Sequence, residues 1–102
     1  MEKLKTAIVH MIERVSFTGP EEKRKETTTV MAAFPDEIDA ESWLQKHLED
    51  DYGWDLTRFK VVPDGDGKRV RVTDMNPWRG CDRDYHVYTI KEAALLMEEV
   101  GP

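Results

Sequence analysis

Carboxylates are concentrated in residues 36–55, where eight acidic residues stand against Lys46 alone. Three of these acids fall in the last turn of a predicted helix. There the negative end of the helix dipole makes each exposed carboxylate unfavourable by about 0.3 to 1 kcal/mol. Because stability does not favour acids at this place, we expect them to face a basic partner, although pairing with the basic residues that follow is an alternative. The predicted acidic patch consists of Glu49, Asp50, Asp51 and Asp55.

A second candidate binding surface lies in residues 74–84, which read as a loop of about ten residues in a small domain. Loops of this length are often binding loops, and Trp, Arg and Tyr are the usual anchors of protein interfaces. A Trp on the turn Pro77-Trp78-Arg79-Gly80 is awkward to bury, but its folding back onto the core is the alternative. The residues assigned to this surface are Trp78, Arg79, Arg83 and Tyr85.

Basic residues follow the acidic segment and offer an alternative, nucleic-acid-binding surface. On the outward face of a predicted hairpin they would contact a phosphate backbone. Such a sheet also needs exposed aromatic side chains for base stacking, and Phe59 alternates to the face opposite Lys60. Direct nucleic-acid binding is therefore disfavoured, and a charged edge that prevents aggregation is the simpler interpretation. The residues of this alternative are Arg58, Lys60, Arg69 and Arg71.

Metal-binding and catalytic patterns are weak. Asp82, Asp84 and His86 alternate along a predicted strand beside Cys81, but no further cluster of His or Cys completes a four-ligand zinc site. The turn at residues 64–68 lacks the ligand spacing of a calcium loop. We expect no enzyme activity, no metal and no cofactor, with a small metal-dependent hydrolase around these residues as the weakest alternative.

Composition limits the function classes further. The chain has 102 residues and a formal net charge of −6, from 15 basic and 21 acidic residues. This length suits one domain, residues 1–102. A single cysteine excludes an internal disulfide, and the sequence shows no signal-peptide pattern and no apolar run long enough to span a membrane. We expect a soluble cytoplasmic protein with no membrane contact.

The elements that would position these residues are two helices and about five strands. The spacing of Ala40, Trp43, Leu44, Leu48 and Tyr52 predicts a helix over 39–52 that ends at Gly53. A Thr-x-x-Glu capping box at Thr89 predicts a second helix over 90–100. Residues 59–62 and 69–73 predict a hairpin with Val70 and Val72 inward, while 27–34 and 85–88 predict further strands.

The first segment is ambiguous, because residues 4–17 match both a helical stripe and an alternating strand pattern. Its β-branched residues favour a long strand paired with 26–34 through a charged tip at residues 19–25. The predicted fold is therefore a small α+β domain with a mostly antiparallel sheet, in the order β-β-α-β-β-β-α. A helix in the first segment remains the alternative.

These observations together predict a non-enzymatic, acidic protein-interaction module. Its partner would be a protein with a basic surface, met by the acidic helix end and the Trp78 loop. One specific form is an inhibitor that occupies the nucleic-acid-binding surface of an enzyme, with carboxylates in the place of phosphates. Small acidic proteins of phages and other mobile elements include such inhibitors. The sequence does not identify the partner or the oligomeric state.

Overall fold

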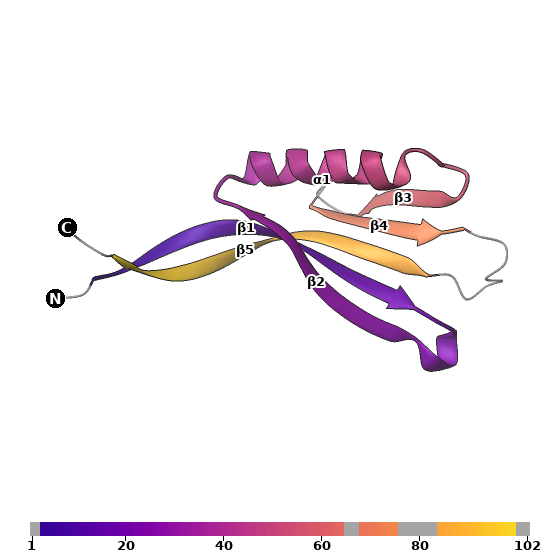
Figure 1. Ribbon diagram of the computed structural model, residues 1–102, viewed down its shortest axis with the longest axis horizontal. Coiled ribbons are helices and arrows are strands. Elements are labelled where there is room, and N and C mark those ends of the chain that lie inside the picture. The colour runs from indigo at the N-terminus through magenta and orange to yellow at the C-terminus, as the bar shows by residue number, and fades with distance from the viewer. Residues whose placement is uncertain (1–2, 65–67, 76–83, 100–102) are drawn as a thin grey trace.

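The fold is one five-stranded antiparallel sheet covered on one face by a single helix (Figure 1). The computed structural model describes residues 3–64, 68–75 and 84–99. Neighbouring strands lie in the order β2-β1-β5-β4-β3, and every pair is antiparallel. The elements are β1 (Lys3–Thr18), the 3-10 turn η1 (Glu21–Lys23), β2 (Lys25–Phe34), α1 (Glu37–Tyr52), β3 (Phe59–Asp64), β4 (Arg69–Asp74) and β5 (Tyr85–Glu99).

The predicted helix over 39–52 is confirmed as α1, which begins two residues earlier. The Asp36 side chain accepts a hydrogen bond from the Ile38 amide at 2.9 Å, which is an N-cap contact. The helix ends where predicted, at Gly53, whose amide donates to the Glu49 carbonyl. A Cβ at this position would lie 2.6 Å from that carbonyl oxygen, so the close approach of the backbone requires glycine.

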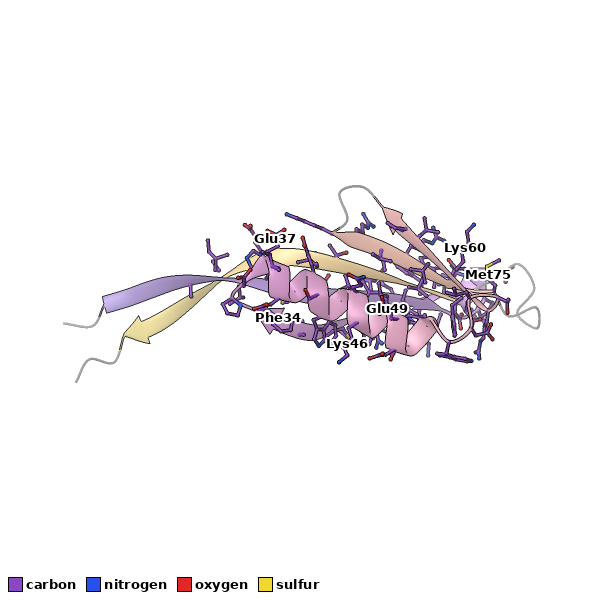
Figure 2. The ribbon with its side chains drawn as sticks, turned by 90° about the horizontal axis from the view of Figure 1, so that it is seen from above. Phe34, Glu37, Lys46, Glu49, Lys60 and Met75 are labelled. Atoms are coloured by element: carbon purple, nitrogen blue, oxygen red, sulfur yellow. The ribbon has the colours of Figure 1, made fainter. Side chains whose placement is uncertain are left out.

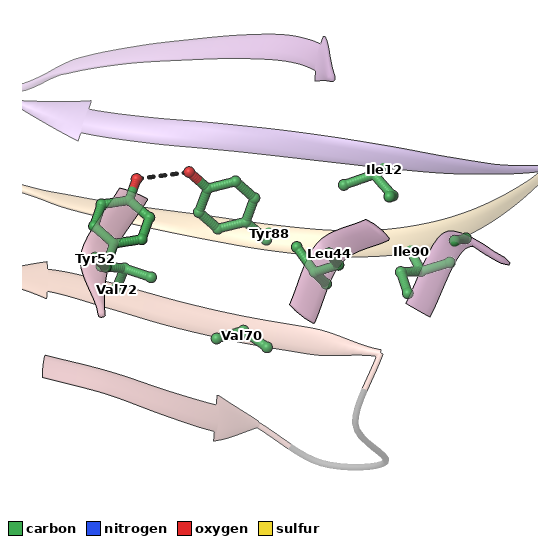
Figure 3. Close-up of a cluster of buried hydrophobic side chains, with 8 residues drawn as sticks. Ile12, Leu44, Tyr52, Val70, Val72, Tyr88 and Ile90 are labelled. Atoms are coloured by element: carbon green, nitrogen blue, oxygen red, sulfur yellow. Dashed lines mark hydrogen bonds between the residues drawn. The ribbon is translucent and has the colours of Figure 1, made fainter. Parts of the chain in front are cut away.

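The core lies between α1 and the sheet (Figure 3). Strand alternation and the helical stripe bring eight side chains together, and the predicted inward positions Val70 and Val72 are both buried. Trp43 and Leu48 of the predicted stripe pack against this core at its margin. The buried residues are Ile12, Ala40, Leu44, Tyr52, Val70, Val72, Tyr88 and Ile90.

The second predicted helix, over 90–100, is wrong. The described part of this segment, to Glu99, belongs to strand β5 and pairs with β1 from Tyr85↔Phe17 to Glu99↔Lys3. The capping-box residue Thr89 lies in the middle of the strand, next to buried Ile90. The segment forms a strand despite its local helix propensity, because the long strand β1 pairs with it along its whole described length and tertiary pairing overrides such propensities. The element order is therefore β-β-α-β-β-β.

The first segment is a strand, as favoured, and its helical alternative is excluded. It forms the predicted hairpin with β2, with a change of register between Ile12 and Glu13 that leaves Met31 without an opposite residue on β1. The buried member of β1 is Ile12, so the even-numbered positions face α1. The other alternating set, which includes Val15 and Phe17, lies on the sheet face without a helix. We call this the open face.

The molecule is elongated, with extents of 61 × 29 × 23 Å. Strands β1 and β5 continue past the other strands as a twisted two-stranded ribbon (Figure 1). Among the described residues, no helix is long and apolar enough to cross a membrane.

Candidate functional site

Two large apolar side chains are presented on the short connection between α1 and β3. Trp54 is 64% exposed and Leu56 is 71% exposed, although each stands beside the hydrophobic core. Single exposed apolar residues are ordinary on protein surfaces. Two such residues on one turn, beside an acidic helix end, form the apolar centre and charged surround that mark interaction sites.

The turn that carries these two side chains is held in place by hydrogen bonds. The Trp54 indole Nε1 donates to the Asp51 carbonyl at 2.6 Å, and its ring meets Phe59 edge-on with centroids 5.7 Å apart. This bond also satisfies a carbonyl at the end of α1, which has no partner within the helix. Trp54 is thus fixed in orientation while most of its surface faces solvent, so binding costs it little conformational entropy.

Asp55 organises the other half of the same turn. Its Oδ1 accepts from the Thr57 hydroxyl at 2.6 Å and from the amides of Thr57 and Arg58 at 3.2 Å. The Thr57 hydroxyl bond is the largest cause that lowers the pKa of this carboxyl below its ordinary value. Desolvation, the next largest, opposes it, and the two amide bonds add to the lowering. The Asp55 carboxylate, which we predicted to face a partner, is therefore engaged in hydrogen bonds that fix the backbone on either side of Leu56.

A groove runs between α1 and the β3–β4 hairpin and leads to this turn. It consists of two adjoining hollows of about 380 and 200 Å³ that share Gln45 and Leu48. Glu41 lies at the larger hollow, and Glu49 and Leu56 lie at the smaller one. The floor is apolar, formed by Leu44, Val61, Pro63, Val70 and Ile90. We call this feature the α1–β3 groove.

The acids at the end of α1 lie at the surface. Glu49, Asp50 and Asp51 are exposed, and Figure 2 labels Glu49 and Lys46 on α1, seen from above. The last turn of the helix holds no basic residue. Asp51 contacts the His47 imidazole at 3.4 Å, and the Glu49 carboxylate accepts a long 3.5 Å bond from Gln45. These contacts stay within the helix.

The nearby basic residues have other contacts. Arg58 pairs with Asp74 at 3.5 Å and lies over the Phe59 ring. Arg71 lies over Tyr85, with its guanidinium carbon 4.1 Å from the ring centroid. None of these contacts involves the acids at the end of α1.

A hydrogen-bonded network beneath α1 fixes the helix on the sheet. The hydroxyls of Tyr52 and Tyr88 lie 2.6 Å apart (Figure 3). The Tyr88 hydroxyl is also 3.3 Å from His47 Nε2. Burial, and then the bond to Tyr88, raise the pKa of Tyr52 well above its ordinary range, so the Tyr52 hydroxyl stays neutral. Trp43 stacks on His47 with centroids 4.9 Å apart and closes the network on its outer side.

The predicted basic surface is divided by the structure. Strand alternation places Lys60, Arg69 and Arg71 on the open face, whereas Arg58 is drawn aside by Asp74. Two aromatic residues also lie on this face: Tyr85 and Phe17 are half-buried and stack on each other, with ring centroids 4.6 Å apart. The pairing of β1 with β5 creates this stack from residues far apart in the chain. Of the predicted loop anchors, Tyr85 alone is described.

The residues of the weak metal and catalytic patterns do not gather into a ligand set within the described residues. Asp84 accepts a hydrogen bond from the Gly19 amide at 3.0 Å, and His86 Nδ1 lies 2.7 Å from the Ser16 hydroxyl. Burial, and then the charge of Arg14, lower the pKa of His86, so the neutral imidazole is favoured. The predicted residues Trp78, Arg79, Cys81, Asp82 and Arg83 lie outside the described residues.

Sequence reasoning did not select Trp54 or Leu56. Both follow Gly53, the predicted end of the helix; Trp54 lies between Asp51 and Asp55, and Leu56 comes directly after Asp55. A Trp on a connection too short to fold back over the core was the signal that could have identified the site. No protein-family model, curated protein or solved structure matches the chain.

Proposed function

We propose that the protein is a non-enzymatic interaction module that binds a basic surface of another protein. The binding surface consists of Trp54, Leu56, the acidic end of α1 and the α1–β3 groove. One observation carries the proposal: two exposed apolar side chains stand on a turn fixed by hydrogen bonds, directly beside exposed carboxylates at a helix end.

The parts of this surface have complementary roles. Large apolar side chains that are already fixed in orientation provide most of the binding energy of an interface, because they lose little freedom on binding. The carboxylates attract a Lys- and Arg-rich surface from a distance and raise the association rate. A nucleic-acid-binding groove is one such surface, and occupying it would make the protein an inhibitor, with Glu49 and Asp50 in the place of phosphates.

The α1–β3 groove narrows the kind of contact expected. Its floor is apolar, and Glu41 and Glu49 stand at its two hollows. A partner segment that combines apolar residues with Lys or Arg fits this arrangement, since its apolar residues would cover the floor while its cations approach the acids. We expect this segment to contact the groove while the main basic surface covers Trp54.

The test compares capture of partners from the source cells by the wild-type chain and by two variants. Trp54→Ala/Leu56→Ala removes the apolar anchors, and Glu49→Gln/Asp50→Asn removes two charges without changing shape. The matched controls are Val30→Ala, an exposed apolar residue on the open face, and Glu22→Gln, an exposed acid in η1.

We expect one stoichiometric partner that the wild type and both controls retain. The anchor variant should weaken its affinity by about 30-fold or more, the effect of losing about 2 kcal/mol at an interface centre. The charge variant should mainly slow association, and only at low salt. Duplex DNA should compete with the wild-type protein for the purified partner. Equal capture by every variant, or no stoichiometric partner, would refute the proposal.

A second candidate function is binding of single-stranded nucleic acid on the open face. The observation that favours it is the presence of Phe17 and Tyr85 beside Lys60 and Arg71. However, Tyr85 of β5 lies between Phe17 of β1 and Arg71 of β4, so its ring faces are already covered and a base cannot stack on them. A mobility shift with single-stranded DNA and RNA at low salt that is lost on Arg71→Gln would support this function over the first.

A further inference from the structure

The paired ends of β1 and β5 form a ribbon that no third strand accompanies among the described residues. Strand β2 makes its last pair with β1 at Phe34↔His10, and the last pair of β4 with β5 is Arg69↔Thr89. Beyond these points, residues 3–9 pair with residues 93–99 and with no other described segment (Figure 1). We call this ribbon the β1–β5 arm.

The β1–β5 arm is richer in apolar residues than a ribbon exposed to solvent on both faces would be. Ala7, Ile8 and Val9 stand opposite Leu95, Ala94 and Ala93, and Ile8 is 58% exposed. Alternation directs Ile8 to one face and its two neighbours to the other, so both faces carry apolar side chains. A two-stranded ribbon is at best marginally stable in water, and further strands or packing are needed. The arm therefore calls for an additional strand.

The free edge of β1 is the better place for that strand. Along residues 3–9, no strand of the described part of the chain pairs with β1 on the side that β2 occupies further along. Thr6, Ile8 and Val9 are β-branched and favour pairing, whereas the β5 edge offers Ala93, Ala94, Leu95, Leu96 and Met97, which favour it less. The β5 edge also carries Glu92, Glu98 and Glu99, so two such edges would bring acids together.

We propose that a second copy of this chain supplies the strand, with the two β1 edges paired antiparallel about a two-fold axis. Two identical edges satisfy each other only in this arrangement, which is an isologous contact. β2 blocks the edge from His10 onward, so the longest pairing available places residue 6 opposite residue 6. In this register residue 4 faces residue 8 of the other copy, and residue 5 faces residue 7.

The register explains the charges on the arm. Lys3 and Lys5 come to lie opposite Val9 and Ala7 of the second copy, so no like charges face each other directly. In the register of β1 with β5, residue 3 is opposite residue 99 of its own chain. Two threonines meet at the axis, a cross-strand pair that is favourable in sheets. The result is a four-stranded ribbon in the order β5, β1, β1 and β5, which removes the isolated arm. The proposal is independent of the partner-binding surface on α1.

The test traps the register with cysteines in a Cys81→Ser background. Residues on the axis of an antiparallel pair have Cα atoms about 4.5 to 5.5 Å apart, within the range of a disulfide. Thr6→Cys alone should therefore form a covalent dimer on mild oxidation. Leu4→Cys and Ile8→Cys should each remain uncrosslinked alone and should crosslink to each other when mixed. Ala94→Cys, on the opposite edge of the arm, should not crosslink.

Sedimentation of the wild-type chain is a second measurement of dimer formation, and it does not depend on the folding of a cysteine variant. We expect a monomer–dimer equilibrium across the micromolar range, weakened about tenfold or more by Thr6→Lys, which places two cations on the axis. A monomer at every concentration up to several hundred micromolar would overturn the proposal. So would crosslinking through Ala94→Cys with none through Thr6→Cys, since this would assign the contact to the β5 edge.

Discussion

Neutralising two acids at the end of α1 should make the protein more stable. Glu49 and Asp50 lie in the last turn, which holds no basic residue, and both are exposed. Each opposes the helix dipole at a cost of about 0.3 to 1 kcal/mol. Glu49→Gln/Asp50→Asn keeps the shape and nearly the helix propensity of both residues. The double variant thus removes the charge with little other change.

The expected gain in stability is the removed helix-dipole cost, reduced by the loss of two favourable side-chain interactions. The variant loses the charge on the 3.5 Å bond between Gln45 and Glu49, and it loses the attraction between Lys46 and Asp50 one turn apart. Pairs of this kind on exposed helices contribute about 0.2 to 0.5 kcal/mol each. We therefore expect the free energy of unfolding to rise by about 0.5 to 1 kcal/mol at low ionic strength, a few degrees in Tm for a domain of this size.

Urea denaturation at low salt and at about 1 M salt measures the effect, and at high salt the gain should disappear because the Debye length falls to about 3 Å. Asp39→Asn in the first turn is the mirror control, since a carboxylate there favours the dipole and its loss should destabilise the protein. A loss of stability in Glu49→Gln/Asp50→Asn would mean that these acids form stabilising contacts inside the molecule. The argument that they are present for a partner would then fail.

Four further substitutions test the structure. Tyr88→Phe should lower the free energy of unfolding by about 1 to 3 kcal/mol, because it leaves the buried Tyr52 hydroxyl unpaired. Tyr52→Phe should lower it less, since the Tyr88 hydroxyl keeps its contact with His47. A double-mutant cycle should show coupling between the two tyrosines. Gly53→Ala should cost about 1 to 3 kcal/mol in thermal denaturation, because its Cβ would lie 2.6 Å from a helix carbonyl, and an unchanged Tm would contradict this contact. The pKa of His86 is lowered in the folded state, so its contribution to stability is present above the ordinary histidine pKa of about 6.5 and is lost as the pH falls toward the lower folded-state pKa. His86→Gln should therefore flatten this part of the plot of unfolding free energy against pH. An unchanged plot would exclude the effect.

Local patterns predicted those elements whose signals lie within one segment. The stripe of α1, its end at Gly53 and the inward valines of β4 all follow from short-range periodicity, and the structure confirms them. The second half of β5 does not follow from such signals. Residues 90–99 favour a helix by composition, and only the distant strand β1 makes them a strand.

The candidate site was predictable in charge but not in its apolar centre. Glu49, Asp50 and Asp51 follow from the sequence because their position in the helix is local. The exposure of Trp54 depends on the turn that Asp55 closes and on the bond from the indole to Asp51, which no spacing rule reveals. The stack of Phe17 on Tyr85 likewise depends on a register between the first and last strands.

The position of β5 in the sheet has a consequence for how the chain reaches its fold. β5 follows the other four described strands in the sequence, yet it lies in the middle of the sheet and joins the hairpin β1–β2 to the hairpin β3–β4. During synthesis on the ribosome, both hairpins and α1 emerge before the strand that connects them. Until it arrives, α1 lacks Tyr88 and Ile90 beneath it, and one long edge of each hairpin is open to other chains. The sheet should therefore form late, through contacts between residues far apart in the sequence, and such folding is slow for a chain of this size. Until the sheet is complete, the nascent protein depends on protection from aggregation.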